Sequence, residues 1–208
     1  PKNRALLISS LLSLLALGLL ASLSGPAAGL GLAYILLNLA YSLRLKRIAV
    51  LDIVIISLGF VLRLYVGSVV TNVPLSAWIV IMTFLLALFI ALAKRRDDIL
   101  IYQSTGQKMR KVIDGYNLTF VDSAMVVMAS VVIVSYILYT RSPDVVTRLG
   151  SDHLYATTIF VILGILRYLQ ICFVNEDSGS PTRIVLKDRQ MQIIILGWIF
   201  SFAWIIYI

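Results

Sequence analysis

Lysine and arginine side chains alternate with aspartates at several points of the sequence, a combination that can bind phosphate groups and a divalent cation. The densest example is Lys-Arg-Arg-Asp-Asp at residues 94–98, and a second basic run follows at residues 108–111. Guanidinium groups bind phosphate oxygens through paired hydrogen bonds. Carboxylates hold Mg²⁺, which is often shared with substrate phosphates. The pattern therefore favours an enzyme that acts on a phosphorylated substrate.

Seven apolar segments must position these groups. Of the 208 residues, 60% are hydrophobic and 13% are charged, and the mean hydropathy is +0.97. This composition excludes soluble globular and disordered classes. Because a bilayer span needs about 20 apolar residues, we predict an all-α, polytopic membrane bundle that forms one domain over residues 1–208. The predicted spans are residues 5–24, 27–43, 50–70, 75–93, 119–140, 153–173 and 190–208.

The longest predicted connection, residues 94–118, is too long and too amphiphilic for a simple turn. The apolar stretch Ile99-Leu100-Ile101-Tyr102 separates its two basic runs. Such a pattern is typical of an interfacial helix that lies at the membrane surface. We therefore expect a cap over the mouth of a cavity.

The distribution of basic residues predicts the orientation of the spans. Because successive spans alternate in direction, 14 of the 18 Lys and Arg residues fall on the side that holds the N-terminus, and two fall on the other side. Basic connections remain in the cytoplasm. We therefore predict a cytoplasmic N-terminus and polar face, and a C-terminus outside the cell membrane. The same bias explains much of the net charge of +8 without a nucleic-acid partner.

Two arginines lie within predicted spans, where a charge is costly unless it faces the bundle interior or a polar cavity. Arg63 follows Asp52 by eleven residues, about three helical turns, so it either pairs with a buried acid or contributes to such a cavity. Arg167 lies near the predicted cytoplasmic end of its span and can also reach the interface. Asp122 is expected to cap or complement the start of its helix.

Three blocks of sequence resemble the UbiA-type intramembrane prenyltransferase superfamily, most closely its decaprenyl-phosphate phosphoribosyltransferase branch. The first block, residues 41–63, is similar to the segment YSxxLKxxxxLD…GFxLR. The second, residues 93–116, resembles KRxxE…RxxLxxY, and the third, residues 166–190, resembles LRY…LRDR. The blocks occur in the family's order and cover most of the chain.

The resemblance implies nine spans around a cavity with a cytoplasmic mouth. The family's first two spans and its NDxxDxxxD motif would precede Pro1, since no NDxxD pattern occurs in the sequence. We therefore expect an N-terminally truncated sequence that keeps seven spans and lacks the main Mg²⁺ ligands. The implied reaction transfers a 5-phosphoribosyl group from phosphoribosyl pyrophosphate to a polyprenyl phosphate, with Mg²⁺ as cofactor. Its product would serve as a precursor of a lipid-linked pentose donor for cell-envelope polysaccharide.

The resemblance also implies roles for individual residues. Lys46 and Asp98 would be catalytic, and Asp97 and Asp98 would hold metal. Asp98 stands where the branch has Glu, so its reach is one methylene shorter and Asp97 can substitute for it. The substrate-binding residues would be Tyr41 and Lys46 on the diphosphate or lipid phosphate, Lys94 and Arg95 on phosphate, Arg110 and Tyr116 in the cap, and Arg167 and Asp188 at the mouth.

Two other functions remain open at this point. A related prenyltransferase would move a prenyl group from prenyl diphosphate to an aromatic acceptor, and such enzymes carry a DxxxD motif where this sequence has adjacent aspartates and many basic residues. A transporter or lipid-binding protein is the alternative from another class. A transporter requires broken spans with acidic residues near the middle, whereas the polar groups here gather at one end.

Overall fold

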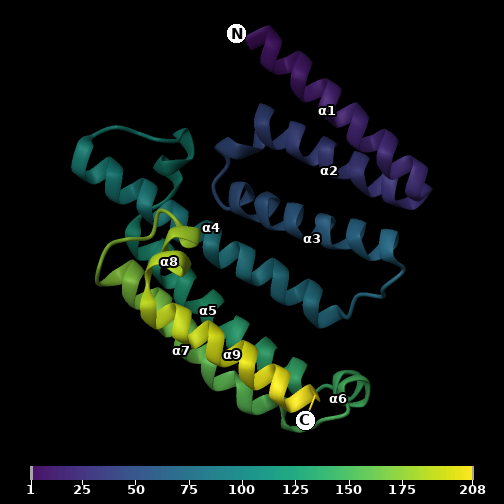
Figure 1. Ribbon diagram of the computed structural model, residues 1–208. Helices are drawn as coiled ribbons and strands as arrows, with labels where there is room; N and C mark the ends of the chain where they lie inside the picture. Colours follow the sequence, from purple (N-terminus) through teal and green to yellow (C-terminus); the bar gives the residue numbers. More distant parts are fainter. Residues whose placement is uncertain (1, 208) are drawn as a thin grey trace. The chain divides into compact units, whose positions relative to one another are not determined.

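The structure is a computed structural model that describes Lys2 to Tyr207, with side chains from Arg4 onward. Every regular element in this range is a helix (Figure 1), as the sequence predicts. The long helices are α1 (Lys2–Leu23), α2 (Gly25–Leu43), α3 (Leu51–Thr71), α4 (Ala77–Thr105), α5 (Leu118–Arg141), α7 (Thr158–Phe173) and α9 (Arg189–Tyr207). The short elements are α6 (Pro143–Leu149), α8 (Pro181–Lys187) and three 3₁₀ turns, η1 (Leu45–Arg47), η2 (Lys111–Gly115) and η3 (His153–Thr157).

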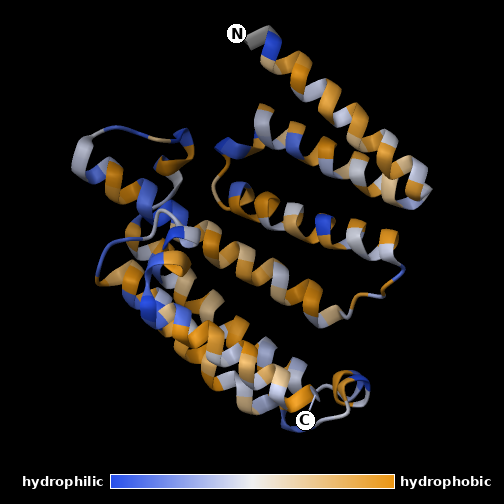
Figure 2. Ribbon diagram, in the orientation of Figure 1, coloured by the Kyte–Doolittle hydropathy of each residue, from blue (hydrophilic) through white to orange (hydrophobic). Residues whose placement is uncertain are grey.

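Seven helices in the described range are long and apolar enough to cross a membrane, counting η3 and α7 as one. They coincide with the seven predicted spans. Hydrophilic residues gather mainly in the connections, while the long helices are mostly hydrophobic (Figure 2). The leucines of α1, such as Leu7 and Leu19, are exposed, as expected for a helix surrounded by lipid. The chain is therefore a polytopic helical membrane protein.

Helix α4 extends twelve residues past the predicted end of its span. It continues through the charged run at residues 94–98 and ends where Gly106, with φ of +70°, donates its N–H to the carbonyl of Tyr102. A glycine in this left-handed conformation is a common helix terminator. Residues 94–118, which the sequence predicts to form a cap, consist of the last turns of α4 followed by a loop that contains η2.

The chain forms two compact units, Pro1–Phe84 and Leu85–Ile208. In the first unit, α2 packs against both α1 and α3. Its α3 buries Asp52 and Ser57, and the Ser57 hydroxyl donates to the carbonyl of Ile53 at 2.9 Å. This unit carries the block that contains Tyr41 and Lys46.

The second unit packs α7 against α5 and α9. A buried polar network joins these helices, because the indole N–H of Trp198 donates to the Tyr136 hydroxyl at 2.8 Å and that hydroxyl bonds Thr157 at 2.8 Å. Helix α5 begins at the N-cap Asn117, whose side chain accepts from the N–H of Phe120 at 2.7 Å. The network ties α5 and α9 to the turn before α7, and the cap fixes the start of α5.

Candidate active site

Asp98 joins the end of α4 to the loop that follows it. Its Oδ2 accepts from Nη1 of Arg95 at 2.9 Å and lies 3.2 Å from Nε of Arg110. Arg95 is 2% exposed and Asp98 is 15% exposed, whereas Arg110 is 48% exposed. The structure thus brings these three predicted site residues together, with one carboxylate oxygen shared by two guanidinium groups.

The loop after α4 is held by a second ion pair. Lys108 pairs with Asp114, which raises the pKa of Lys108 through their hydrogen bond. The Lys108 ammonium also lies 5.3 Å from the centre of the Tyr102 ring. Tyr116 is buried and packs against Phe120 with ring centres 6.0 Å apart. The loop is therefore anchored at both ends, and Tyr116 contributes to its core.

Arg96 links three helices of the second unit. Its Nε donates to Oδ1 of Asp122 at 2.9 Å, and its guanidinium lies 5.1 Å from the ring centre of Phe173. Its Nη1 is buried without a hydrogen-bond partner among the described residues. Of the two expectations for Asp122, capping is wrong, because Asn117 is the N-cap of α5. Asp122 instead pairs with Arg96 across 26 positions of sequence, close to the start of the same helix.

Asp97 differs from Asp98 in having its carboxylate unengaged. It forms no hydrogen bond or ion pair with the residues that the structure describes. It lies close enough to Asp177, in the loop before α8, for the two negative charges to repel each other. The backbone at Gly179 approaches closely, since an added Cβ there would lie 2.8 Å from Cγ of Asp97. Glycine at position 179 therefore allows this loop to lie against the end of α4.

Asp97 and Asp177 are the pair best suited to a cation in the second unit. No group of three metal-binding side chains occurs within the described part of the chain. Mg²⁺ commonly uses one or two carboxylates together with substrate phosphates, so two free acids fit a metal that arrives with its substrate. Asp98 is less suited, because arginines occupy its Oδ2.

Arg167 and Asp188 form a two-pronged ion pair between α7 and the start of α9. Nε of Arg167 donates to Oδ1 at 3.2 Å and Nη2 donates to Oδ2 at 2.6 Å. Oδ1 also accepts from the N–H of Met191 at 2.8 Å, which caps α9. The hydrogen bonds from Arg167 hold the pKa of the Asp188 carboxyl below its ordinary value. This pair fixes two helix ends at the predicted mouth.

A polar cavity of about 300 Å³ lies beside this pair. Its charged lining comes from Asp177, Arg183, Lys187 and Asp188, and Asn175 adds an amide. Arg183 and Lys187 are exposed and form no ion pair with other described residues. These two cations are not among the predicted site residues, although their spacing of four places them on one face of a helix.

The remaining predicted residues are exposed or line a separate cavity. Lys46 is exposed in η1, and Lys94 is exposed on α4. Tyr41 lines a cavity of about 140 Å³ between α2 and α3. Tyr41 and Lys46 belong to the first unit, whereas Lys94 and the arginine–aspartate clusters belong to the second.

The fold and these clusters define a multi-pass helical membrane protein with phosphate-binding potential at its helix ends. Residues 1–194 match the UbiA prenyltransferase family. The chain therefore belongs to this family, which confirms the resemblance carried by the three sequence blocks.

Within this family, the chain is similar to several relatives that share one name. The chain is 35% identical over 180 residues to the decaprenyl-phosphate phosphoribosyltransferase of Mycolicibacterium smegmatis, covering 84% of this chain and 56% of that protein. The chain is 30% identical to the protein of the same name from Corynebacterium glutamicum, covering 84% of this chain and 52% of that protein. It is 31% identical to the protein of that name from Mycobacterium tuberculosis, covering 80% of this chain and 54% of that protein. The chain spans about half the length of these curated relatives.

Proposed function

We propose that the chain belongs to an enzyme that transfers a 5-phosphoribosyl group from phosphoribosyl pyrophosphate to a polyprenyl phosphate. The observation that carries this proposal is the similarity, over at least 80% of the chain, to relatives that bear the name decaprenyl-phosphate phosphoribosyltransferase. The cation-lined cavity supports it, because the donor carries a pyrophosphate and a separate 5-phosphate. In this proposal the product leads to a lipid-linked pentose donor for cell-envelope polysaccharide.

The second unit supplies cations for the donor. Arg183 and Lys187 are free to bind phosphate oxygens in the 300 Å³ cavity. Lys94 is exposed on α4 and is also available to a phosphate group. Asp97 and Asp177 would hold Mg²⁺, which supplies charge neutralisation at the pyrophosphate when bound. Asp98, paired with Arg95 and Arg110, would position the loop over the donor instead of binding metal directly.

The transfer needs charge stabilisation more than proton transfer. The bond between C1 of the ribosyl group and the pyrophosphate oxygen breaks, and its electron pair leaves with pyrophosphate. A phosphate oxygen of the lipid donates a lone pair to C1 and forms the new bond. A phosphomonoester is already ionised near neutral pH, so no strong general base is required. Cationic side chains that bind the leaving pyrophosphate lower the barrier.

The orientation is part of the same proposal. The α2–α3 connection with Lys46 and the end of α4 with Lys94 fall on one side of the membrane, because α3 and α4 cross it in opposite directions. The excess of basic residues on that side favours the cytoplasm. We therefore place the site and the N-terminus of this chain at the cytoplasmic face of the cell membrane, with the C-terminus outside.

The direct test incubates membranes that contain the protein with Mg²⁺, labelled phosphoribosyl pyrophosphate and polyprenyl phosphate. The expected product is a labelled lipid, formed together with pyrophosphate. Label that enters an aromatic acceptor from prenyl diphosphate would instead identify an aromatic prenyltransferase. Binding of polyprenyl phosphate without transfer from either donor would identify a lipid-binding protein and overturn the proposal.

A further inference from the structure

Arg63 stands far from either end of its membrane-spanning helix. It is the thirteenth residue of α3, about 18 Å along the axis from Leu51 at 1.5 Å per residue. Its side chain is exposed on the helix surface. A guanidinium at this depth must face a polar cavity or a partner of opposite charge, because lipid does not solvate it.

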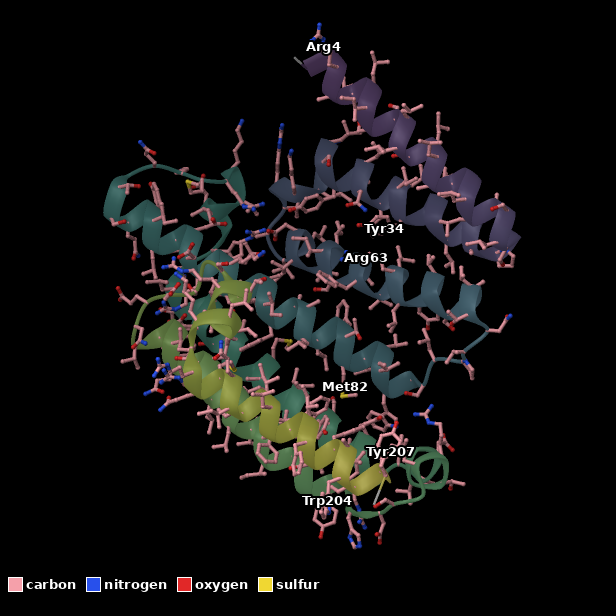
Figure 3. All side chains as sticks on the ribbon, in the orientation of Figure 1. Arg4, Tyr34, Arg63, Met82, Trp204 and Tyr207 are labelled. Carbon is pink, nitrogen blue, oxygen red and sulfur yellow. The ribbon has the colours of Figure 1, made fainter. Side chains whose placement is uncertain are left out.

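The contacts of Arg63 leave its charge without a counter-ion. Its Nε donates to the carbonyl of Gly59 at 3.2 Å, and its guanidinium carbon lies 4.2 Å from the ring centre of Phe60 and 5.7 Å from that of Tyr34. Figure 3 shows Tyr34 and Arg63 on the facing sides of α2 and α3. All three partners are neutral, so none of them offsets the charge of the guanidinium.

No carboxylate within the first unit compensates this charge. Asp52 is the one acidic residue in the sequence from 1 to 84, and it lies eleven residues earlier on α3, where it is fully buried. Within the described range Arg63 forms no ion pair. The sequence predicts that Arg63 either pairs with a buried acid or contributes to a polar cavity. Within the first unit it does not pair with an acid, so the second prediction, a polar cavity, is the one to consider.

The cavity at Arg63 has the lining that an anionic lipid headgroup requires. It encloses about 140 Å³, and its polar lining consists of Tyr34, Asn38, Tyr41 and Arg63. The Asn38 amide donates one N–H to the carbonyl of Tyr34 at 2.8 Å, which leaves its second N–H for another acceptor. The remaining lining is apolar, from Leu37, Ile55, Ile56, Gly59 and Phe60.

The cavity extends along α2 and α3 toward their connected ends. Tyr41 lies two residues before the end of α2, and Ile55 lies four residues after the start of α3. Lys46 lies in the connection between these two helices. A phosphate group in the cavity would therefore be held by one guanidinium and two phenol hydroxyls, with an apolar wall for the chain attached to it.

We propose that the pocket around Arg63 binds the phosphate of the isoprenoid acceptor lipid. The inference rests on the proposed function, since it assigns the acceptor's headgroup to a place in the chain. The apolar lining and the depth of Arg63 favour a phosphate attached to a hydrocarbon chain over free phosphate. A monoester phosphate, with nearly two negative charges, neutralises Arg63 better than a phosphodiester does.

The test measures lipid binding without the phosphoribosyl donor. The full chain in phosphatidylcholine nanodiscs is titrated with polyprenyl phosphate, polyprenol, phosphatidic acid and inorganic phosphate, with bound lipid counted by native mass spectrometry. We expect Arg63→Gln to weaken polyprenyl phosphate binding at least tenfold while polyprenol binding stays the same. Arg63→Lys should retain part of the affinity, and Arg148→Gln, on exposed α6, should retain all of it.

Several results would overturn the inference. Equal losses for polyprenyl phosphate and polyprenol in Arg63→Gln would assign Arg63 a structural role. Saturation by inorganic phosphate alone, or equal competition by phosphatidic acid, would identify a different source of phosphate. If Arg63→Gln does not fold, Tyr34→Phe is expected to weaken binding of the phosphate-bearing lipid selectively, and no change there would also overturn the assignment.

The two proposals fail in different ways. Arg63-dependent binding of polyprenyl phosphate without ribosyl transfer would remove the proposed function and keep the phosphate pocket. If Arg63→Gln transfers the ribosyl group with an unchanged KM for polyprenyl phosphate, the proposed function stands. The assignment of the phosphate pocket to Arg63 is then wrong.

Discussion

Arg167 and Asp188 are joined by two hydrogen bonds, of 3.2 and 2.6 Å, across 21 positions of sequence. The same carboxylate caps α9 through the N–H of Met191. One aspartate therefore serves both an ion pair with α7 and the start of the last helix. The pair therefore links α7 to the start of α9 at the predicted mouth.

Removal of the Asp188 carboxylate should destabilise the second unit. Asp188→Ala removes a helix N-cap, which alone costs about 1 kcal/mol, and leaves Arg167 without its partner. We expect a lower unfolding temperature in detergent, measured by circular dichroism. The Asp188→Ala and Arg167→Gln changes should be coupled. The double variant should be destabilised by less than the sum of the destabilisations of the two single variants. Glu176→Gln, an exposed change nearby, is the control, and additive effects would contradict the pairing.

The stability of the protein should also depend on the ionisation of Asp188. Its pKa in the folded state is lowered from 3.8 by Arg167. A lowered pKa means that the stabilisation is complete above the unfolded pKa and is lost as pH falls through the folded value. The unfolding temperature of the wild type should therefore exceed that of Asp188→Asn at neutral pH, and the difference should shrink below about pH 4. A difference that stays constant down to that pH would argue against the ion pair.

Lys46 is expected to be essential for turnover but not for membrane insertion. It is exposed in η1, where its ammonium is available to a phosphate group. We expect Lys46→Ala in the full-length protein to lower turnover about 10²-fold, the usual effect of removing a group that stabilises transition-state charge. The amount of protein in the membrane fraction should not change. Arg47→Ala, at the adjacent exposed position, is the matched control, and wild-type turnover in Lys46→Ala would remove Lys46 from the site.

The cavity lined by Arg183 and Lys187 should determine affinity for the donor. Loss of one charge-assisted hydrogen bond to phosphate should raise KM for phosphoribosyl pyrophosphate about tenfold in Arg183→Gln or Lys187→Gln. KM for polyprenyl phosphate should stay close to that of the wild type. Steady-state kinetics with each substrate varied in turn measures both values, and Arg148→Gln serves as the control. Equal changes in the two KM values would indicate a structural effect instead.

Asp97 and Asp98 should respond differently to metal. Removal of Mg²⁺ with a chelator is expected to abolish transfer, and Asp97→Asn should raise the Mg²⁺ concentration needed for half-maximal activity. Asp98→Asn should instead release Arg110 and loosen the loop after α4, because Asp98 bridges Arg95 and Arg110. Faster trypsin cleavage at Lys108 to Lys111 in Asp98→Asn would reveal the loosening. The same Mg²⁺ dependence in wild type and Asp97→Asn would exclude Asp97 as a ligand.

Parts of the site were accessible to sequence reasoning and parts were not. The family resemblance predicted Asp98 and Asp188 as site residues, and both stand at the ends of long apolar segments. The pairing of Asp122 with Arg96 was missed, since local spacing indicates a helix cap and gives no information on a contact 26 residues away. Arg183 and Lys187 were counted among residues that orient the spans, although their spacing of four indicated one helix face.

The sequence by itself determined the helical class, the seven spans and the family, because these depend on apolar length and on local motifs. Tertiary structure decided which charges neutralise one another. Asp98 and Asp188 are engaged by arginines, Asp97 keeps its carboxylate unengaged, and Arg63 faces a polar cavity without an acid. The physical reason is that hydropathy and spacing act within one helix, whereas the partner of a charge depends on which helix ends meet.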